Sequence, residues 1–176
     1  MQRVVRGEEA AFTELIAKYK TPVHAFVYRL LNDFEEADDV AQEVFIKVYR
    51  LADLYQPRAK FTTWLFALAH NLAVDRLRRR KQRRTLAGEQ AEAEIKMAAD
   101  TNSNPSQALG RREKIAAVQQ AIEQLPLDQK TALLLYQYEN LSYAEIGQVM
   151  RCSVKSVEAR LYRARESLRA RLAKWL

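Results

Sequence analysis

The scarcity of glycine and proline constrains the fold of this chain more than any other feature of its sequence. Only 4 Gly and 4 Pro occur in 176 residues, so the signals that mark tight turns between strands are few. Ala, Leu, Glu, Arg and Gln, which favour helices, are common. Hydrophobic residues make up 48% of the chain, which is enough for a packed core. The sequence therefore predicts an all-α protein.

Basic residues gather in two separate blocks. The formal net charge is +7, which indicates a polyanionic partner. Residues 61–84 hold 7 basic residues against one acid, and residues 151–176 hold 8 against 2. The stretch between the blocks is neutral or acidic. Two separate contacts with a polyanion would explain this distribution.

The segment 85–108 is predicted to be a flexible linker, because turn-forming residues cluster within it and apolar periodicity is absent. A short helix at about 89–97 remains open. We therefore expect two small helical domains, at 1–84 and 109–176.

Apolar spacing predicts the helices. Three are expected in the first domain, at about 8–31, at 35–55, and from a cap at Thr62 or Thr63 into the basic run; Pro22 is a candidate break or kink. Four shorter ones are expected in the second domain, at about 111–124, 128–138, 143–150 and 154–173.

Residues 141–165 predict a helix-turn-helix. Ser142 and Glu145 match a capping box, and Ser153 is the expected cap of the second helix. Glycine is often favoured in the turn, yet Arg151 occupies it and Gly147 lies inside the first helix.

The second helix of this motif would lie in the DNA major groove. Arg160, Arg163 and Arg165 would then face phosphates or bases. The alternative is an ordinary helical hairpin with a solvated basic face.

The first basic block follows an aromatic cluster of Phe61, Trp64 and Phe66. Aromatic rings stack on unpaired bases and basic residues bind phosphate, so this segment suits single-stranded or melting DNA. For Phe66 and Leu68 we prefer a place in the core, and for Trp64 both interpretations stay open.

Within residues 32–50, acidic and apolar residues alternate at helical spacing, so one polar surface is expected to contain Asp38, Asp39, Gln42, Glu43 and Lys47. Adjacent residues on a helix point about 100° apart, so Asp38 and Asp39 converge poorly on a metal. A protein-docking surface is the preferred interpretation, and a plain solvated face is the alternative.

No catalytic constellation, phosphate-binding loop or nucleophile motif is visible. Cys152 is the single cysteine and only two histidines, His24 and His70, are present, so a metal site is not expected. Neither a membrane-spanning run nor a signal-peptide core occurs. We expect a cytoplasmic protein that is not an enzyme and needs no cofactor.

Four blocks of this chain, in this order, resemble the extracytoplasmic-function (ECF) sigma factors of the sigma-70 family: AFTELIAKY, DFEEADDVAQEVFIKVYR, FTTWLFALAHNLAVDRLRR, and the stretch from IEQLP to SVKSVEARLYRAR. The resemblance implies two sigma domains that direct core RNA polymerase to promoters by recognising −35 and −10 elements. It also implies control by an anti-sigma factor, without direct membrane insertion.

The resemblance assigns three sets of residues. The surface for the clamp helices of the largest polymerase subunit would comprise Asp38, Asp39, Gln42, Glu43 and Phe45. The −10 element would be bound by Phe61, Trp64, Asn71, Arg76, Arg78, Arg79 and Arg80, with Asn71 helping to hold a flipped-out base. The −35 element would be bound by Lys155, Ser156, Ala159, Arg160, Tyr162, Arg163 and Arg165.

Two other classes of function remain as alternatives. One is a helix-turn-helix regulator that binds duplex DNA by itself as a dimer, but it has no use for the 61–84 block. The other is an enzyme acting on nucleic acid through Asp38, Asp39, Glu43 and a divalent metal.

Overall fold

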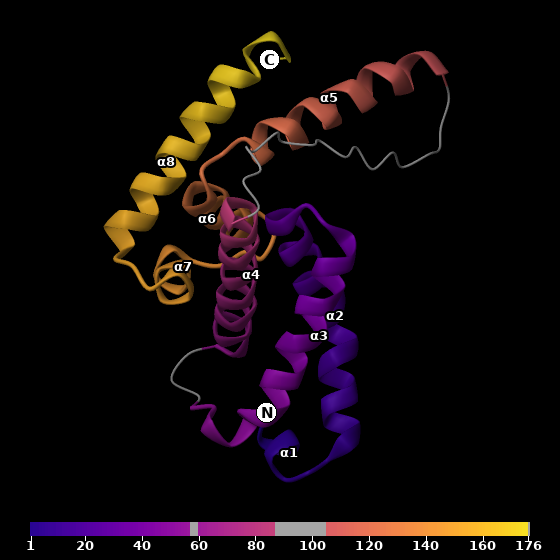
Figure 1. Cartoon of the computed structure of the whole chain (residues 1–176), viewed down its shortest axis with the longest axis vertical. Helices are drawn as coiled ribbons and strands as arrows, with labels where there is room; N and C mark the ends of the chain where they lie inside the picture. Colours follow the sequence, from indigo (N-terminus) through magenta and orange to yellow (C-terminus); the bar gives the residue numbers. More distant parts are fainter. Residues whose placement is uncertain (57–59, 87–104, 176) are drawn as a thin grey trace.

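The computed structural model describes residues 1–56, 60–86 and 105–175, with side chains from residue 112 onward in the last range. Every regular element in these ranges is a helix, so the expected all-α class is confirmed. Figure 1 shows α1–α4 at one end of the long axis and α5 and α8 toward the other, with the two termini far apart.

The N-terminal unit is a helical bundle. Its elements are α1 Gln2–Val5, α2 Glu9–Leu31, α3 Phe34–Arg50, the 3₁₀ turn η1 Ala52–Leu54 and α4 Phe61–Leu86. The helices α2, α3 and α4 contact one another and each buries an apolar stripe. Because apolar residues recur every three or four positions, one face of each helix enters the shared core.

The helix α2 does not break at Pro22, so the candidate break there is wrong. Proline removes one backbone hydrogen bond, whereas the following turns bury Val23, Phe26 and Val27 against α3 and α4. This burial outweighs the lost bond. The helix ends at Asn32, whose left-handed conformation (φ 53°) turns the chain toward α3.

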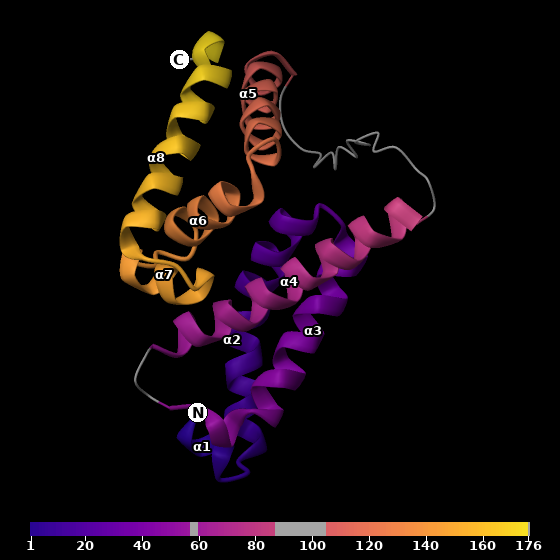
Figure 2. The same ribbon diagram turned by 60° about the vertical axis from the view of Figure 1, so that its left-hand side comes forward.

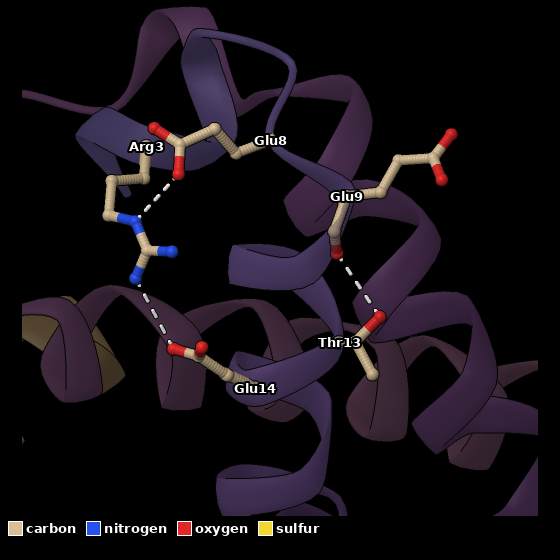
Figure 3. Close-up of polar contacts among 5 residues, drawn as sticks. All are labelled: Arg3, Glu8, Glu9, Thr13 and Glu14. Carbon is tan, nitrogen blue, oxygen red and sulfur yellow. Dashed lines mark hydrogen bonds and ion pairs between the residues drawn. The ribbon is translucent and has the colours of Figure 1, made fainter.

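The short helix α1, which the sequence did not predict, is fastened to the start of α2. Arg3 Nε donates to Glu8 Oε2 at 2.8 Å and Arg3 Nη1 contacts Glu14 Oε2 at 3.4 Å (Figure 3). Nearby, Thr13 Oγ1 donates to the carbonyl of Glu9 at 3.1 Å (Figure 3). These exposed contacts are individually weak, so the burial of Val4 supplies the anchor.

Two expected boundaries in this unit are wrong. The helix α3 ends at Arg50, short of the expected residue 55. The helix α4 begins at Phe61, before the expected cap at Thr62 or Thr63. Thr63 is buried, and its Oγ1 has no hydrogen-bond partner within the described ranges. Packing of this turn into the core therefore overrides the local capping preference.

The helices α4 and α5 extend into the two ends of the segment 85–108, which was predicted to be a linker. Thr85 and Leu86 belong to α4, and α5 begins at Pro105. The rest of the predicted linker, including the possible helix at 89–97, lies outside the described residues.

The four expected helices of the C-terminal unit are confirmed. They are α5 Pro105–Glu123, α6 Leu127–Gln137, α7 Tyr143–Met150 and α8 Val154–Arg171, followed by the 3₁₀ turn η2 Ala173–Trp175. Only α5 departs clearly from its expected bounds, by starting earlier. The fully buried side chains Leu134, Ile146 and Leu161 join α6, α7 and α8 in one core.

The two units contact each other. The helix α7 lies against α4, and α2 contacts α6 (Figures 1 and 2). Lys60, which precedes α4, forms an ion pair with Glu145 of α7 at 3.0 Å. Buried residues of both units belong to a single hydrophobic cluster. The sequence analysis did not predict this contact.

Candidate nucleic-acid interface

The helix-turn-helix begins with the expected capping box, which is confirmed. The N–H of Glu145 donates to Ser142 Oγ at 3.3 Å, and the N–H of Ser142 donates to Glu145 Oε2 at 2.8 Å. Hydrogen bonds from Ser142, first from its hydroxyl, and then from Lys60 lower the pKa of Glu145 to about 2. The carboxylate therefore stays ionised at the N-terminus of α7, where the helix dipole favours negative charge.

The tight turn between α7 and α8 depends on a glycine inside α7, at position 147, and not on a glycine in the turn itself. Arg151 takes the left-handed conformation itself, with φ 51°. Gly147, one turn earlier, accepts a hydrogen bond at its carbonyl from the N–H of Cys152 at 2.9 Å. A Cβ on Gly147 would lie 2.8 Å from the carbonyl oxygen of Cys152. The glycine within the first helix is thus what lets the turn close so tightly.

The helix α8 starts at the expected cap, since the N–H of Ser156 donates to Ser153 Oγ at 3.2 Å. Its inner face buries Val157 and Leu161 against the rest of the motif. Most of the residues expected to bind the −35 element lie on the outer side. Lys155, Tyr162, Arg163 and Arg165 are exposed, and Ser156, Ala159 and Arg160 are half-buried.

Two of the arginines that are expected to bind the −35 element contact side chains of α6. Arg160 Nε pairs with Asp128 Oδ2 at 3.1 Å, and its Nη1 lies 3.0 Å from Cys152 Sγ. The Arg165 guanidinium lies over the Tyr136 ring, 5.3 Å from its centroid. These contacts orient both side chains before any ligand arrives.

The aromatic residues at the start of α4 form a cluster. Trp64 lies 6.0 Å from Phe61 and 5.2 Å from Tyr55 between ring centroids, and Phe61 lies 5.3 Å from Tyr19. Phe61 and Trp64 are both half-buried. Phe66 is only 2% exposed and packs edge-on against Phe26, which confirms its interpretation as a core residue.

The second half of α4 presents the basic block. Asn71, Arg76 and Arg80 are half-buried, and Arg78 and Arg79 are exposed. None of these four arginines forms an ion pair with another residue of the described ranges. Their charge is therefore available to a partner such as the phosphate backbone.

The polar face of α3 is held by contacts along the helix. Gln42 Nε2 donates to Asp38 Oδ2 at 2.8 Å, and Lys47 Nζ lies 3.9 Å from Glu43 Oε1. Within the described ranges, no group of three or more His, Cys, Asp or Glu side chains is arranged to hold a metal ion. The acids on α3 form a row of hydrogen-bond acceptors along the helix.

A groove beside this polar face was missed by the sequence analysis. It has a volume of about 410 Å³ and lies between α2 and α3, with apolar walls formed by Phe12, Ile16, Phe45, Ile46 and Tyr49. Phe45 is 6% exposed and forms its floor, whereas Ile46 is 50% and Tyr49 61% exposed. The sequence signal that could have predicted the groove is the pair Ile46 and Tyr49, two large apolar residues within two helical turns of Gln42 on an otherwise polar face.

Comparison with known proteins matches both units to one family. Residues 15–84 match the model of sigma-70 region 2, and residues 115–168 match that of sigma-70 region 4. The chain is 40% identical to the RNA polymerase sigma-H factor of Pseudomonas aeruginosa, covering 96% of this chain and 89% of that protein. The chain belongs to the sigma-70 family.

Other relatives place it among the ECF members of that family. The ECF RNA polymerase sigma factor SigW of Bacillus subtilis is 34% identical, with 98% of this chain and 94% of SigW covered. The ECF RNA polymerase sigma-E factor of Escherichia coli K12 is 35% identical, with 96% and 90% covered. The aromatic cluster and the basic block of α4 thus fall in region 2, and the helix-turn-helix falls in region 4.

Two solved structures share the fold. One is the sigma factor RpoE in complex with the anti-sigma factor NepR from Bartonella quintana, with a TM-score of 0.75, 21% identity, and 93% of this chain and 97% of that chain covered. The other is CnrH in complex with the cytosolic domain of CnrY, with a TM-score of 0.71, 22% identity, and 98% and 94% covered. The ECF sigma fold therefore extends over nearly the whole sequence. No helix in the described ranges is long and apolar enough to cross a bilayer.

Proposed function

We propose that this chain directs core RNA polymerase to its promoters, with α8 binding the −35 element and α4 binding and helping to melt the −10 element. The observation that carries the proposal is that one chain of this family has two separate basic surfaces, one on α8 and one on α4. The helix α8 exposes Lys155, Tyr162 and Arg163 on a helix-turn-helix, while α4 ends in a basic block without internal ion pairs. Linking two weak contacts raises the overall affinity.

The division of labour follows the two kinds of surface. The helix-turn-helix suits duplex DNA, because a helix fits the major groove and arginine reads guanine edges. The aromatic cluster with Asn71 and the basic run suits unpaired DNA, because bases stack on rings and phosphates pair with guanidinium groups. Residues 1–84 and 109–176 thus serve as the −10 and −35 domains.

The surface for core polymerase is the polar face of α3 together with the neighbouring groove. Asp38, Asp39, Gln42 and Glu43 supply acceptors for basic or polar groups on the clamp helices of the largest subunit. Ile46 and Tyr49 add exposed apolar area beside them. Protein interfaces commonly combine such an apolar centre with a polar rim.

We further infer that an anti-sigma factor controls the chain. The similar structure of RpoE is a complex with the anti-sigma factor NepR, and the similar structure of CnrH is a complex with the cytosolic domain of CnrY. The chain would act in the cytoplasm, where polymerase and DNA are found. It would supply binding and not chemistry, as a transcription initiation factor and not an enzyme.

Run-off transcription with purified core polymerase tests the proposal. On a promoter library, we expect transcripts from defined start sites only when the protein is added. Arg163→Ala should weaken use of the −35 element, and Asn71→Ala should weaken use of the −10 element while binding to core polymerase survives. Arg112→Ala, an exposed arginine on α5, is the matched control.

Unchanged transcription in both variants would contradict the assignment of Arg163 to the −35 element and of Asn71 to the −10 element. The absence of any dependent transcript, together with failure to bind core polymerase, would overturn the proposed function. A palindromic footprint made by the protein alone would then favour a helix-turn-helix regulator.

A further inference from the structure

The helix α8 packs on the rest of its unit along an apolar stripe. Val157, Leu161 and Ala164 are fully buried, and α8 lies against α6 (Figure 2). Consecutive residues of a helix are about 100° apart, so these three side chains point within about 60° of one another. The stripe therefore defines the inner face of α8, and the direction of every other side chain on the helix can be measured from it.

Two arginines, Arg160 and Arg165, flank this stripe. By the same helical spacing, each points about 70° from the centre of the stripe, in opposite directions. Lys155, Tyr162 and Arg163 point more than about 120° away from the stripe, and all three are exposed. The three arginines that are expected to bind the −35 element thus differ in direction, since two lie beside the core and one lies on the outer face.

Arg160 is bound on the inner side of the motif. Its Nε pairs with Oδ2 of Asp128, in the first turn of α6, at 3.1 Å. Its Nη1 lies 3.0 Å from Sγ of Cys152, in the turn before α8. The side chain of Arg160 is only 23% exposed. Its guanidinium therefore links α8 to α6 and to the turn, and has little surface left for DNA.

Arg165 reaches the other end of α6. Its guanidinium lies 5.3 Å from the centroid of the Tyr136 ring, and this ring packs against Tyr143 of α7 at 5.5 Å between centroids. Asp128 and Tyr136 are eight positions apart, which is about 12 Å along α6. Two contacts this far apart, on opposite sides of the apolar stripe, oppose rotation of α8 about its own axis.

We propose that Arg160 and Arg165 are positioning residues, which hold α8 on α6 through Asp128 and Tyr136 and do not read the −35 bases. The two α6 contacts (Asp128–Arg160 and Tyr136–Arg165) fix the rotation of α8 at which its outer face, with Arg163, is turned to the major groove. Because this geometry is set before DNA binds, less conformational freedom is lost on binding. The inference rests on the proposed function, since it assigns a role within −35 recognition.

One substitution gives opposite results for a positioning role and for a DNA contact. If Asp128 positions α8 through Arg160, Asp128→Asn breaks the same contact as Arg160→Ala, and both should lower −35-dependent transcription. If Arg160 contacts DNA, Asp128→Asn frees its guanidinium and removes a negative charge near the phosphates, so use of the −35 element should rise. Asp128→Glu keeps the carboxylate and should restore −35 use.

Run-off transcription with core polymerase on two templates measures the effect. Both templates carry the same −10 element, and one carries a scrambled −35 element. We expect the ratio of the two transcripts to fall about two- to fivefold in Asp128→Asn and in Arg160→Ala. The double variant should fall no further than Arg160→Ala alone, because the same contact is lost.

The matched control is Glu113→Gln, which removes an exposed carboxylate from α5 and should leave the transcript ratio unchanged. A ratio that is unchanged or raised in Asp128→Asn overturns the positioning role of Arg160. Independent losses that multiply in the double variant overturn it as well.

The second contact is tested through the ring of Tyr136. Tyr136→Phe keeps the aromatic face that the guanidinium covers and should retain the transcript ratio. Tyr136→Leu keeps an apolar side chain without that face, and should lower the ratio as Arg165→Ala does. Equal ratios for the Phe and Leu variants overturn the positioning role of Arg165.

Urea unfolding of the free full-length chain tests the Asp128–Arg160 contact without polymerase. The urea midpoint of Asp128→Asn/Arg160→Ala should equal that of Arg160→Ala alone, and additive shifts overturn the contact whatever the transcription shows. If the unaltered chain gives no −35-dependent transcript, the proposed function fails, whereas the unfolding experiment still decides whether Asp128 and Arg160 hold α8 together with α6.

Discussion

Replacement of Gly147 by alanine tests whether the helix-turn-helix depends on that glycine. The added Cβ would lie 2.8 Å from the carbonyl oxygen of Cys152, whereas ordinary contact begins at 3.4 Å. The obstacle is backbone and not a flexible side chain. The same stretch is fixed by the hydrogen bond from the N–H of Cys152 to the Gly147 carbonyl and by the left-handed Arg151.

The expected magnitude is the balance of two opposing effects. Relief of the clash requires the turn to move by about 0.6 Å, and overpacking of this kind costs about 1–3 kcal/mol. Alanine is a better helix former than glycine and returns up to about 1 kcal/mol. We therefore expect Gly147→Ala to lower the free energy of unfolding by about 1–2 kcal/mol.

Urea denaturation followed by circular dichroism measures this change. Gln148→Ala is the matched control, because it is an exposed position on the same helix and should alter stability by no more than about 0.5 kcal/mol. Run-off transcription should show a parallel loss of −35 dependence, since α8 would be displaced relative to α7. A Gly147→Ala protein as stable as the control, or more stable, would refute the reasoning.

Three further predictions follow from the site. Ser142→Ala should lower the free energy of unfolding by about 1 kcal/mol through loss of the helix cap, and equal urea midpoints for variant and wild type would contradict this. Tyr49→Ala should weaken binding to core polymerase by about tenfold if the groove is part of that interface, and unchanged affinity in a pull-down titration would exclude the groove. Burial raises the pKa of Glu139 from 4.5 to about 7, against the opposing effect of Arg29. Because the folded protein binds the Glu139 proton more tightly than the unfolded chain, the resulting stability is fully present below pH 4.5 and is lost as the pH rises through about 7. Glu139→Gln should therefore be more stable than wild type at pH 8, by about 1–2 kcal/mol after allowance for solvent screening. The difference should shrink toward pH 5 in pH-dependent thermal unfolding, and parallel pH profiles for the two proteins would show that Glu139 is not so perturbed.

Features set by neighbours in the sequence were predictable from the sequence alone. The capping box of Ser142 and Glu145 and the Ser153 cap join residues three positions apart, so their partners are visible in one short window. The helices of the C-terminal unit follow from apolar spacing for the same reason. The separation of the two basic blocks is likewise a property of the sequence, since charge does not depend on folding.

The tertiary structure decided what depends on distant residues. The helix α4 starts at Phe61 because the turn around Thr63 is buried by other helices, and no local capping rule contains that information. The need for glycine at position 147 depends on the backbone path of the nearby turn, which places the Cys152 carbonyl oxygen 2.8 Å from where a Cβ would lie.

The contact between Lys60 and Glu145 joins residues 85 positions apart. Each side chain alone resembles an ordinary exposed charge, and nothing in its local sequence specifies a partner. Such pairs form because burial of the apolar faces of separate helices brings the charged residues beside those faces close together. The sequence by itself therefore determined the helices and their chemistry, whereas packing between them decided which functional faces are exposed and which lie covered.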